Sequence, residues 1–358
     1  SVRAHICCKP DQTQGGGDDV PTNVANENMR HATTNVGPAA VAWKHGSTPA
    51  TYVFLRYAAE GTYTYAYSTQ VWGGWSAWGW LGPLVHDATA EPFAALYDSS
   101  LGYRLVIFGA SGGTIRYSLL DENDHHTNPA GVPGQWVSLP SPQGVAFQSV
   151  SAAWVGPYLY VVTRDINTND VWFGALRADF TFFGWQRAVL PAPDPNSGTV
   201  LIKSAAVTPG AAGARDGLLY VVVRQFYPTD PRANDIDIYT YRLTDIFTPP
   251  LAGTWAHPKD PPNVSNIWRD GYSGCQVSGR PAAVFRDHRT GSGAKFNRGS
   301  LWIYYAVQGS GCWKGTNLYY RWSWGDFQAG RQIGVDFDMG RWCGAFLGKN
   351  ACWNGPAP

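Results

Sequence analysis

Three arginines recur at one place in a repeated apolar phrase, and they are the residues best suited to bind a ligand. Arg56, Arg164 and Arg224 each end a five-residue segment that begins with tyrosine. A planar guanidinium offers several fixed donors and also stacks on aromatic rings, so it suits the hydroxyls and ring oxygens of sugars. Because the phrase repeats, we expect the three groups at one height on one face of the fold. The alternative is a structural ion pair with a neighbour such as Asp165 or Asp170.

Tryptophan is the second candidate for ligand binding, with 17 residues in the chain. An indole ring can stack on the apolar face of a sugar, and an arginine beside it would complete a clamp. Packing between sheets is the alternative role and accounts for most of these rings. The four tryptophans between 72 and 80 are too dense for strand alternation to bury all of them. The candidate ligand-binding rings are Trp75, Trp78, Trp185 and Trp255.

Carboxylates and histidines supply the candidates for catalysis. A glycoside hydrolase needs two carboxylates, one of them with a raised pKa. The best-placed acid is Glu91, just before a small-residue strand, and Asp87, Asp98 or Asp287 would act as the base. A polysaccharide lyase would instead use histidine, tyrosine or arginine. The histidines available for that role are His45, His86, His125 and His288.

Metal and cofactor sites are not predicted. The pair His125 and His126, beside Asp121, Glu122 and Asp124, could form a surface cation site, but a solvated loop is the preferred interpretation. The sialidase pattern Ser-x-Asp-x-Gly-x-x-Trp is absent from the sequence.

The elements that must position these residues are four kinds of strand that recur five times. Small-residue strands are expected at 39–43, 93–97, 150–154, 204–207 and 281–285. The apolar phrase follows at 52–56, 105–109, 160–164, 220–224 and 302–306. Strands that alternate aromatic and polar residues come next, at 63–67, 115–118, 171–174, 238–241 and 318–322. Short edge strands close each unit at 75–78, 136–138, 185–187, 255–257 and 331–335.

Four strands per unit predict an all-β protein with the β-propeller fold. The apolar phrases start 53, 55, 60 and 82 residues apart, and small innermost strands suit a crowded axis. We expect five blades in a single domain over 37–358, with residues 1–36 as an arm. A sixth blade built from that arm and the tail after Gly330 is the alternative. The rival fold is a two-domain β-sandwich.

Cysteines and flanking signals predict a secreted protein. The six cysteines lie only in the two end regions, which predicts disulfides that fasten the ends in an oxidising compartment; reduced, buried cysteines are the alternative. They are Cys7, Cys8, Cys275, Cys312, Cys343 and Cys352. The chain begins at Ser1 without a charged and apolar leader, as expected once a signal peptide is removed. Asn263 begins a glycosylation sequon in a proline-rich loop.

Charge and hydropathy exclude two classes of partner. The formal net charge is +1, so there is no overall attraction for nucleic acid or an anionic membrane. No apolar run approaches the 18 residues or so that a membrane-spanning helix requires.

The order of strand-terminal arginine, turn, aromatic strand and Trp-x-x-Trp resembles the repeats of propeller lectins of the fucose-binding and tectonin-like groups. The clearest matches are 52–56 with 74–78, and 160–164 with 170–172, within a resemblance that covers 37–335. In such lectins the sites lie between blades and use arginine, an acid or amide, and tryptophan. The resemblance therefore implies sites at Arg56, Arg164 and Arg224. Units two and five lack the arginine, which argues against a uniform ring of sites.

The function favoured by the sequence is a secreted, lectin-like protein that binds a glycan or polysaccharide without catalysis. One alternative is a propeller-fold glycoside hydrolase or polysaccharide lyase. A second is an extracellular structural protein that self-associates through aromatic faces, because fold alone does not separate these functions.

Overall fold

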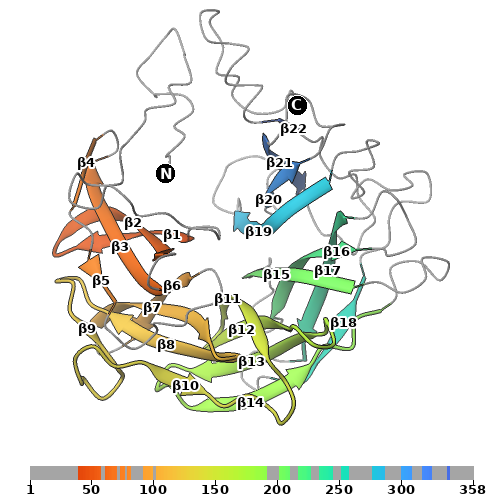
Figure 1. Ribbon diagram of the computed structural model, residues 1–358, viewed down its shortest axis with the longest axis horizontal. Coiled ribbons are helices and arrows are strands. Elements are labelled where there is room, and N and C mark those ends of the chain that lie inside the picture. The colour runs from red at the N-terminus through yellow and green to blue at the C-terminus, as the bar shows by residue number, and fades with distance from the viewer. Residues whose placement is uncertain are drawn as a thin grey trace, which may run out of the picture.

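The described residues of the computed structural model form an all-β structure. They are residues 39–57, 61–70, 73–76, 79–81, 92–99, 102–191, 201–209, 217–226, 234–244, 251–257, 276–286, 300–308, 317–324 and 337–338. Their strands form five antiparallel sheets, each built from strands that follow one another in the chain (Figure 1).

Each sheet repeats the same strand order from the inside outward. The first contains β1 (Ala39–His45), β2 (Thr48–Tyr57), β3 (Thr62–Gln70) and β4 (Gly73–Trp75), with β5 (Gly79–Trp80) also on β3. The second contains β6 (Phe93–Ser99), β7 (Gly102–Ser111), β8 (Thr114–Leu120) and β10 (Val137–Leu139), with β9 (His126–Thr127) also on β8. The third contains β11 (Phe147–Val155), β12 (Tyr158–Asp165), β13 (Val171–Arg177) and β14 (Phe182–Arg187). The fourth contains β15 (Leu201–Pro209), β16 (Leu218–Phe226), β17 (Asn234–Leu243) and β18 (Gly253–Ala256). The fifth contains β19 (Gln276–Arg286), β20 (Ser300–Gln308), β21 (Asn317–Trp324) and β22 (Phe337–Asp338).

The sheets are arranged like the blades of a β-propeller. Their first strands contact one another in succession, from β1 to β6, β11, β15 and β19. Figure 1 shows these strands on the inner side of the arrangement and the short last strands on the outer side. Arg280 of β19 reaches across the centre, where it donates hydrogen bonds to the carbonyl oxygens of Val150 on β11 and of Pro92 before β6. The small side chains expected at the axis, such as Ala205 and Ala206, are buried there.

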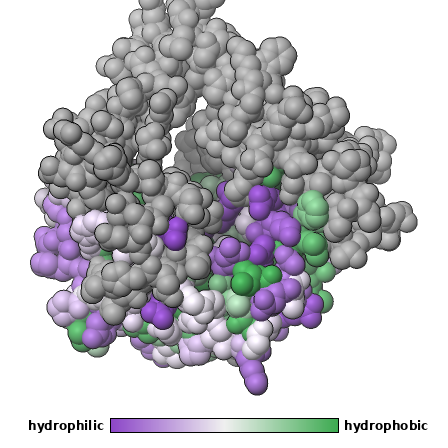
Figure 2. Space-filling view, in the orientation of Figure 1, coloured by the Kyte–Doolittle hydropathy of each residue, from purple (hydrophilic) through white to green (hydrophobic). Residues whose placement is uncertain are grey.

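Among the described residues, four hydrophobic cores lie between successive sheets, so each of the three middle sheets buries one face against the sheet before it and the other against the sheet after it. They join the first and second, second and third, third and fourth, and fourth and fifth sheets. Strand β12 is buried at every residue, as its continuous apolar sequence predicts. The face of the described part seen in Figure 2 is mostly hydrophilic or neutral, with small, separate hydrophobic patches.

The second unit lacks the terminal arginine for a packing reason. Gly109 holds the corresponding position on β7, and the Tyr63 ring of the first sheet lies directly against it. A Cβ atom at Gly109 would lie 2.2 Å from Cε2 of Tyr63. The Tyr63 hydroxyl accepts a hydrogen bond from the backbone N–H of Ala110 at 3.1 Å. An aromatic ring from the neighbouring sheet therefore fills the space that a longer side chain would need.

The comparison with the sequence confirms the all-β class and the recurring four-stranded sheets. The edge strand expected at 331–335 lies outside the described residues, and the last strand of the fifth sheet is Phe337–Asp338. Also outside them are the arm of residues 1–36, the sequon at Asn263 and all six cysteines, namely Cys7, Cys8, Cys275, Cys312, Cys343 and Cys352. Within the part of the chain that the structure describes, no helix has the length and apolar character needed to cross a membrane.

Candidate functional site

Each sheet presents two edges on which polar side chains collect. At one edge the first strand begins and the second strand ends, as the register pairs Ser149 with Arg164 and Ser204 with Arg224 show. We call this the arginine edge. At the opposite edge the first strand turns into the second, as at His45, and we call it the hairpin edge. The two edges hold different chemistry.

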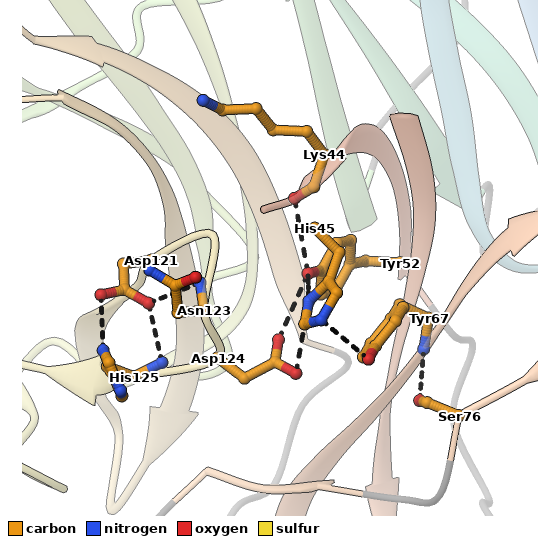
Figure 3. A network of polar contacts seen from close by, with 9 residues as sticks. All are labelled: Lys44, His45, Tyr52, Tyr67, Ser76, Asp121, Asn123, Asp124 and His125. Carbon is orange, nitrogen blue, oxygen red and sulfur yellow. Dashed lines mark hydrogen bonds and ion pairs between the residues drawn. The ribbon is translucent and has the colours of Figure 1, made fainter. Parts of the chain in front are cut away.

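The hairpin edge of the first sheet carries a histidine between two tyrosines. His45 is the last residue of β1, and its Nδ1 lies 3.3 Å from the Tyr52 hydroxyl. Its Nε2 lies 3.0 Å from the hydroxyl of Tyr67 on β3. The two rings of His45 and Tyr67 are stacked, with centroids 4.1 Å apart. The first three strands of this sheet, β1, β2 and β3, thus bring one imidazole and two phenols together (Figure 3).

A loop of the second sheet adds a carboxylate to this group. The Tyr52 hydroxyl donates to Asp124 Oδ1 at 3.2 Å, and Asp124 Oδ2 lies 3.6 Å from His45 Nδ1. The loop docks on the hairpin through a backbone bond from Gly46 to Glu122 at 2.6 Å and an ion pair between Lys44 and Glu122.

The shape of that loop depends on Asp121. Its carboxylate accepts bonds from the backbone N–H groups of Asn123 and His125, each at 2.9 Å, and from Nδ1 of His125. Burial raises the pKa of Asp121, but these hydrogen bonds outweigh it and leave the pKa below the usual value. Asp124 has a φ of 64°, a left-handed conformation that is uncommon outside glycine. The hydrogen bonds to Asp121 therefore fix the loop so that Asp124 keeps an energetically unfavourable backbone conformation.

The donors and acceptors define the tautomer of His45. A carboxylate only accepts, so the Tyr52 proton goes to Asp124, and the Tyr52 oxygen accepts from Nδ1–H of His45. Nε2 is then the unprotonated nitrogen and accepts the hydrogen bond from Tyr67. The chain of hydrogen bonds therefore runs from the Asp124 carboxylate through the Tyr52 hydroxyl and the His45 imidazole to the Tyr67 hydroxyl, and an acid acts on the ring through a hydroxyl.

Burial and charge keep the phenols protonated. Burial raises the pKa of Tyr67, and the nearby charge of Asp124 raises it further. Burial also raises the pKa values of Tyr52 and Tyr65, again with a contribution from Asp124. The pKa of Asp124 itself is raised by burial, although His45 and the bond from Tyr52 oppose this. The His45 side chain is 33% exposed, so the pair of His45 and Tyr67 combines a proton acceptor and a proton donor within reach of solvent.

The predicted arginines lie at the arginine edge. Arg164 is only 8% exposed and donates to the carbonyl oxygens of Ile202 at 3.4 Å and Lys203 at 3.0 Å. It also donates to Gln148 Oε1 at 2.8 Å, so it connects the third sheet to the fourth. Arg224 lies near Arg164, and Arg56 is half-buried at the end of β2.

Two of the predicted tryptophans, Trp185 and Trp255, pack against other rings. The centroid of Trp185 lies 4.7 Å from that of Phe147, and Trp255 lies 4.8 Å from Tyr241 and 5.2 Å from Phe173. Trp75 is the last residue of β4. Trp78 lies outside the described residues, as do the predicted catalytic residues Glu91, Asp87 and Asp287 and the histidines His86 and His288.

In the loop after β8, which the sequence offers as a possible surface cation site, Asp121 and His125 bond to each other. Among the described residues no group of three or more histidine, cysteine, aspartate or glutamate side chains is arranged to hold a metal ion. The sequence analysis named His45 and His125 and gave Asp124 only as part of a possible cation site, and it missed Tyr52 and Tyr67. The tyrosines are visible in the sequence only as strand residues, and Asp124 only as a loop residue.

Comparison with known proteins gives a likeness of fold alone. No family model matches the chain, and no curated protein matches it. The catalytic domain of a GH62 α-L-arabinofuranosidase from Coprinopsis cinerea has 13% identity and a TM-score of 0.48, over 88% of this chain and 94% of that one. An α-L-arabinofuranosidase from Lactobacillus brevis has 10% identity and a TM-score of 0.44, over 85% and 90%. The polysaccharide lyase Uly1 has 12% identity and a TM-score of 0.44, over 93% and 81%.

These comparisons correct the prediction of a lectin without catalysis. The similar solved structures are glycoside hydrolases and a polysaccharide lyase, which correspond to the enzyme alternative and not to the lectin. Arg164 donates to backbone carbonyl oxygens of the next sheet, so a strand-terminal arginine can serve packing between sheets as well as binding. With TM-scores below 0.5, the likenesses assign no activity and no residue roles to this chain.

Proposed function

We propose that this protein is a polysaccharide lyase that cleaves uronate-containing chains by β-elimination at His45 and Tyr67. The observation that carries the proposal is the 3.0 Å contact between His45 Nε2 and the Tyr67 hydroxyl, in a partly exposed position oriented by Asp124. Elimination requires a base for the proton α to the carboxylate and an acid for the leaving oxygen. This pair supplies both functions.

The proton transfers balance within the pair. Nε2 of His45 accepts the proton from C5 of the uronate, the bond from C4 to the glycosidic oxygen breaks, and a C4–C5 double bond forms. The Tyr67 phenol, which its raised pKa keeps protonated, donates its proton to the leaving oxygen. The imidazolium then returns a proton to the phenolate across their hydrogen bond, so the pair is restored without an outside acid or base. Lys44 would exchange its partner Glu122 for the substrate carboxylate.

Hydrolysis receives less support from the described residues. A hydrolase needs two carboxylates that face the same glycosidic bond. Asp121 is bonded within its own turn, and Asp124 is bonded to Tyr52 and lies beside His45. Of the carboxylates predicted for hydrolysis, Glu91, Asp87 and Asp287 lie outside the described part of the chain.

The proposal extends to the scaffold and its setting. We take the five sheets as the complete set of blades of one propeller, with the six cysteines forming disulfides that fasten its ends. The protein would act outside the cell, where such bonds persist and where polysaccharides are its partners. Five successive sheets and cysteines confined to the end regions support this part of the proposal.

The test is product analysis on polygalacturonate, alginate and a glucuronoxylan, with neutral arabinoxylan as a negative control. We expect unsaturated, ultraviolet-absorbing ends from at least one of the acidic polymers and none from arabinoxylan. His45→Gln and Tyr67→Phe should each lower kcat roughly 100- to 10,000-fold. Tyr158→Phe, which removes a hydroxyl at the hairpin edge of the third sheet, is the matched control and should retain activity.

Two results would refute the lyase assignment. One is the absence of unsaturated ends from all three acidic polymers. The other is unsaturated product whose rate is unchanged in both His45→Gln and Tyr67→Phe. New reducing ends without ultraviolet absorbance, lost in Glu91→Gln, would establish hydrolysis in its place.

A further inference from the structure

A second site lies at the arginine edge, where the third and fourth sheets each have a β-bulge in their first strand. In the third sheet the register shifts between Phe147 and Ser149, so Gln148 is an extra residue opposite the end of β12. In the fourth sheet it shifts between Ile202 and Ser204, so Lys203 is the extra residue. Such bulges redirect side chains and occur often beside functional sites. Each bulge is followed by a serine that pairs with the strand-terminal arginine.

Three cations come together at the junction of the third and fourth sheets, namely Arg164, Lys203 and Arg224. Arg164 is held there by the carbonyl oxygens of Ile202 and Lys203. The Lys203 ammonium lies 5.5 Å above the Phe226 ring. Burial lowers the pKa of Arg164, and the charge of Arg224 lowers it further. Burial also lowers the pKa of Lys203, with the charges of both arginines contributing.

Two carboxylates of the third and fourth sheets, Asp165 and Asp237, are bonded to other groups. Asp165 accepts from the backbone N–H groups of Ala146 and Asn167 and from the Thr168 hydroxyl, which form its own turn. Asp237 accepts from Gln225 at 3.1 Å and lies 2.8 Å from Nε2 of His257. Neither carboxylate has a direct bond to Arg164 or Lys203 among the contacts of the described residues. Asp165 acts on Arg164 through its charge alone and raises the pKa of that guanidinium, against the effects of burial and of Arg224.

Buried hydroxyls point to a missing acceptor. Ser149 and Ser204 are each 5% exposed, and their Oγ atoms have no hydrogen-bond partner within the described part of the chain. The Nε atom of Arg164 is also buried without a hydrogen-bond partner in this part of the chain. Buried polar groups are nearly always bonded, so an exception requires an explanation. These donors occur at equivalent positions in two sheets, opposite Arg164 and Arg224, which favours a shared ligand over a local packing fault.

We propose that this junction is an oxyanion-binding site for a carboxylate or sulfate group of an acidic saccharide. Guanidinium, ammonium and hydroxyl groups all donate to such a group, and charge-assisted bonds of this kind are about twice as strong as neutral ones. The bulged Lys203 and the serine beside it provide the contacts from the fourth sheet. The site is at the opposite edge from His45, so it binds independently of the proposed elimination.

The experiment is calorimetric titration of the full chain with an oligogalacturonide, a dextran sulfate oligomer and neutral dextran. The first carries only carboxylates and the second only sulfates, so they distinguish the two sources of the oxyanion. We expect at least one to bind, with an affinity that falls as salt increases, and neutral dextran to remain unbound. Lys203→Gln and Arg224→Gln should each weaken binding about tenfold or more. The dextran sulfate oligomer contains no uronate for the proposed elimination, so its binding tests this site whether or not the lyase proposal fails.

Two further variants separate the site from general charge and from misfolding. Ser204→Ala removes a hydroxyl without a partner, so it should weaken binding while leaving Tm unchanged or higher. Arg177→Gln removes an exposed cation from the hairpin edge of the third sheet and should bind as wild type. The proposal is overturned if neither acidic probe binds, if Arg177→Gln weakens binding as much as Lys203→Gln does, or if Lys203→Gln and Ser204→Ala both bind as wild type.

Discussion

Protonation of one partly buried histidine, His126, is expected to make the fold sensitive to acid. His126 lies on β9, with its ring edge-on to Trp136 at a centroid distance of 5.6 Å. Its Nε2 is buried without a hydrogen-bond partner among the described residues. An imidazolium in this position would lose its hydration without gaining an acceptor. Burial therefore lowers the pKa of His126 from 6.5 to about 4.

The direction and size of the effect follow from linkage. In the unfolded chain His126 takes up its proton near pH 6.5, and in the folded protein only near pH 4. Between these values the unfolded state binds more protons, so the free energy of unfolding falls as the pH falls. A difference of about 2.5 pH units at 1.36 kcal/mol per unit gives about 3 kcal/mol. The free energy of unfolding that depends on neutral His126 is fully present above pH 6.5, and it is almost fully lost when the pH has fallen through 4.

The assay is urea unfolding between pH 7 and pH 4 for the wild type and for His126→Gln, which cannot titrate. We expect the stability of the wild type to fall by about 3 kcal/mol more than that of the variant over this range. The substitution itself changes the free energy of unfolding by the same amount at every pH. Only the difference between the two chains in how this free energy varies with pH is therefore evaluated. Parallel curves for wild type and His126→Gln, or an NMR titration of His126 near pH 6.5, would refute the reasoning.

Three further predictions concern contacts within and between sheets. Gly109→Ala places a Cβ atom 2.2 Å from a ring carbon of Tyr63 and should cost about 1–3 kcal/mol in urea unfolding, a loss that Tyr63→Leu in the same chain should reduce. Ser151→Ala removes the acceptor for the backbone N–H of Val207, 3.0 Å away on the next sheet, and should cost about 1–3 kcal/mol by the same assay. Burial raises the pKa of Tyr241 to about 12, so in a spectrophotometric alkaline titration this phenol should ionise after exposed tyrosines, which titrate near pH 10.

The sequence pattern predicted the strands well, because burial on both faces leaves a simple signature. A blade is covered on each side by another blade, so its second strand tolerates apolar residues at every position. Tyr160, Val161 and Val162 are all fully buried, as the continuous apolar phrase required. The small residues of the first strands also followed directly from crowding at the axis.

The candidate site was less predictable, because it depends on how a loop of one sheet docks on a hairpin of the next. Spacing placed His45 at a strand end, but the carboxylate beside it comes from 79 residues further along the chain. Asp124 reaches it through a left-handed backbone conformation that no local pattern predicts. The same loop, judged by composition alone, was interpreted as solvated. The docking contact from Gly46 to Glu122 joins two backbones and therefore leaves no signal in residue type.

The burial of Arg164 changes which ligands the arginine edge can recognise. Two of its donors are fixed on carbonyl oxygens and Gln148, so the guanidinium cannot turn to follow the varied hydroxyls of a neutral sugar. What it keeps is a positive charge in a poorly hydrated place, reinforced by Lys203 and Arg224. Charge acts over a longer range than a directed hydrogen bond and does not require the donor to move. The same arginine that first suggested sugar hydroxyls therefore selects, in its observed setting, for the acidic groups of a saccharide.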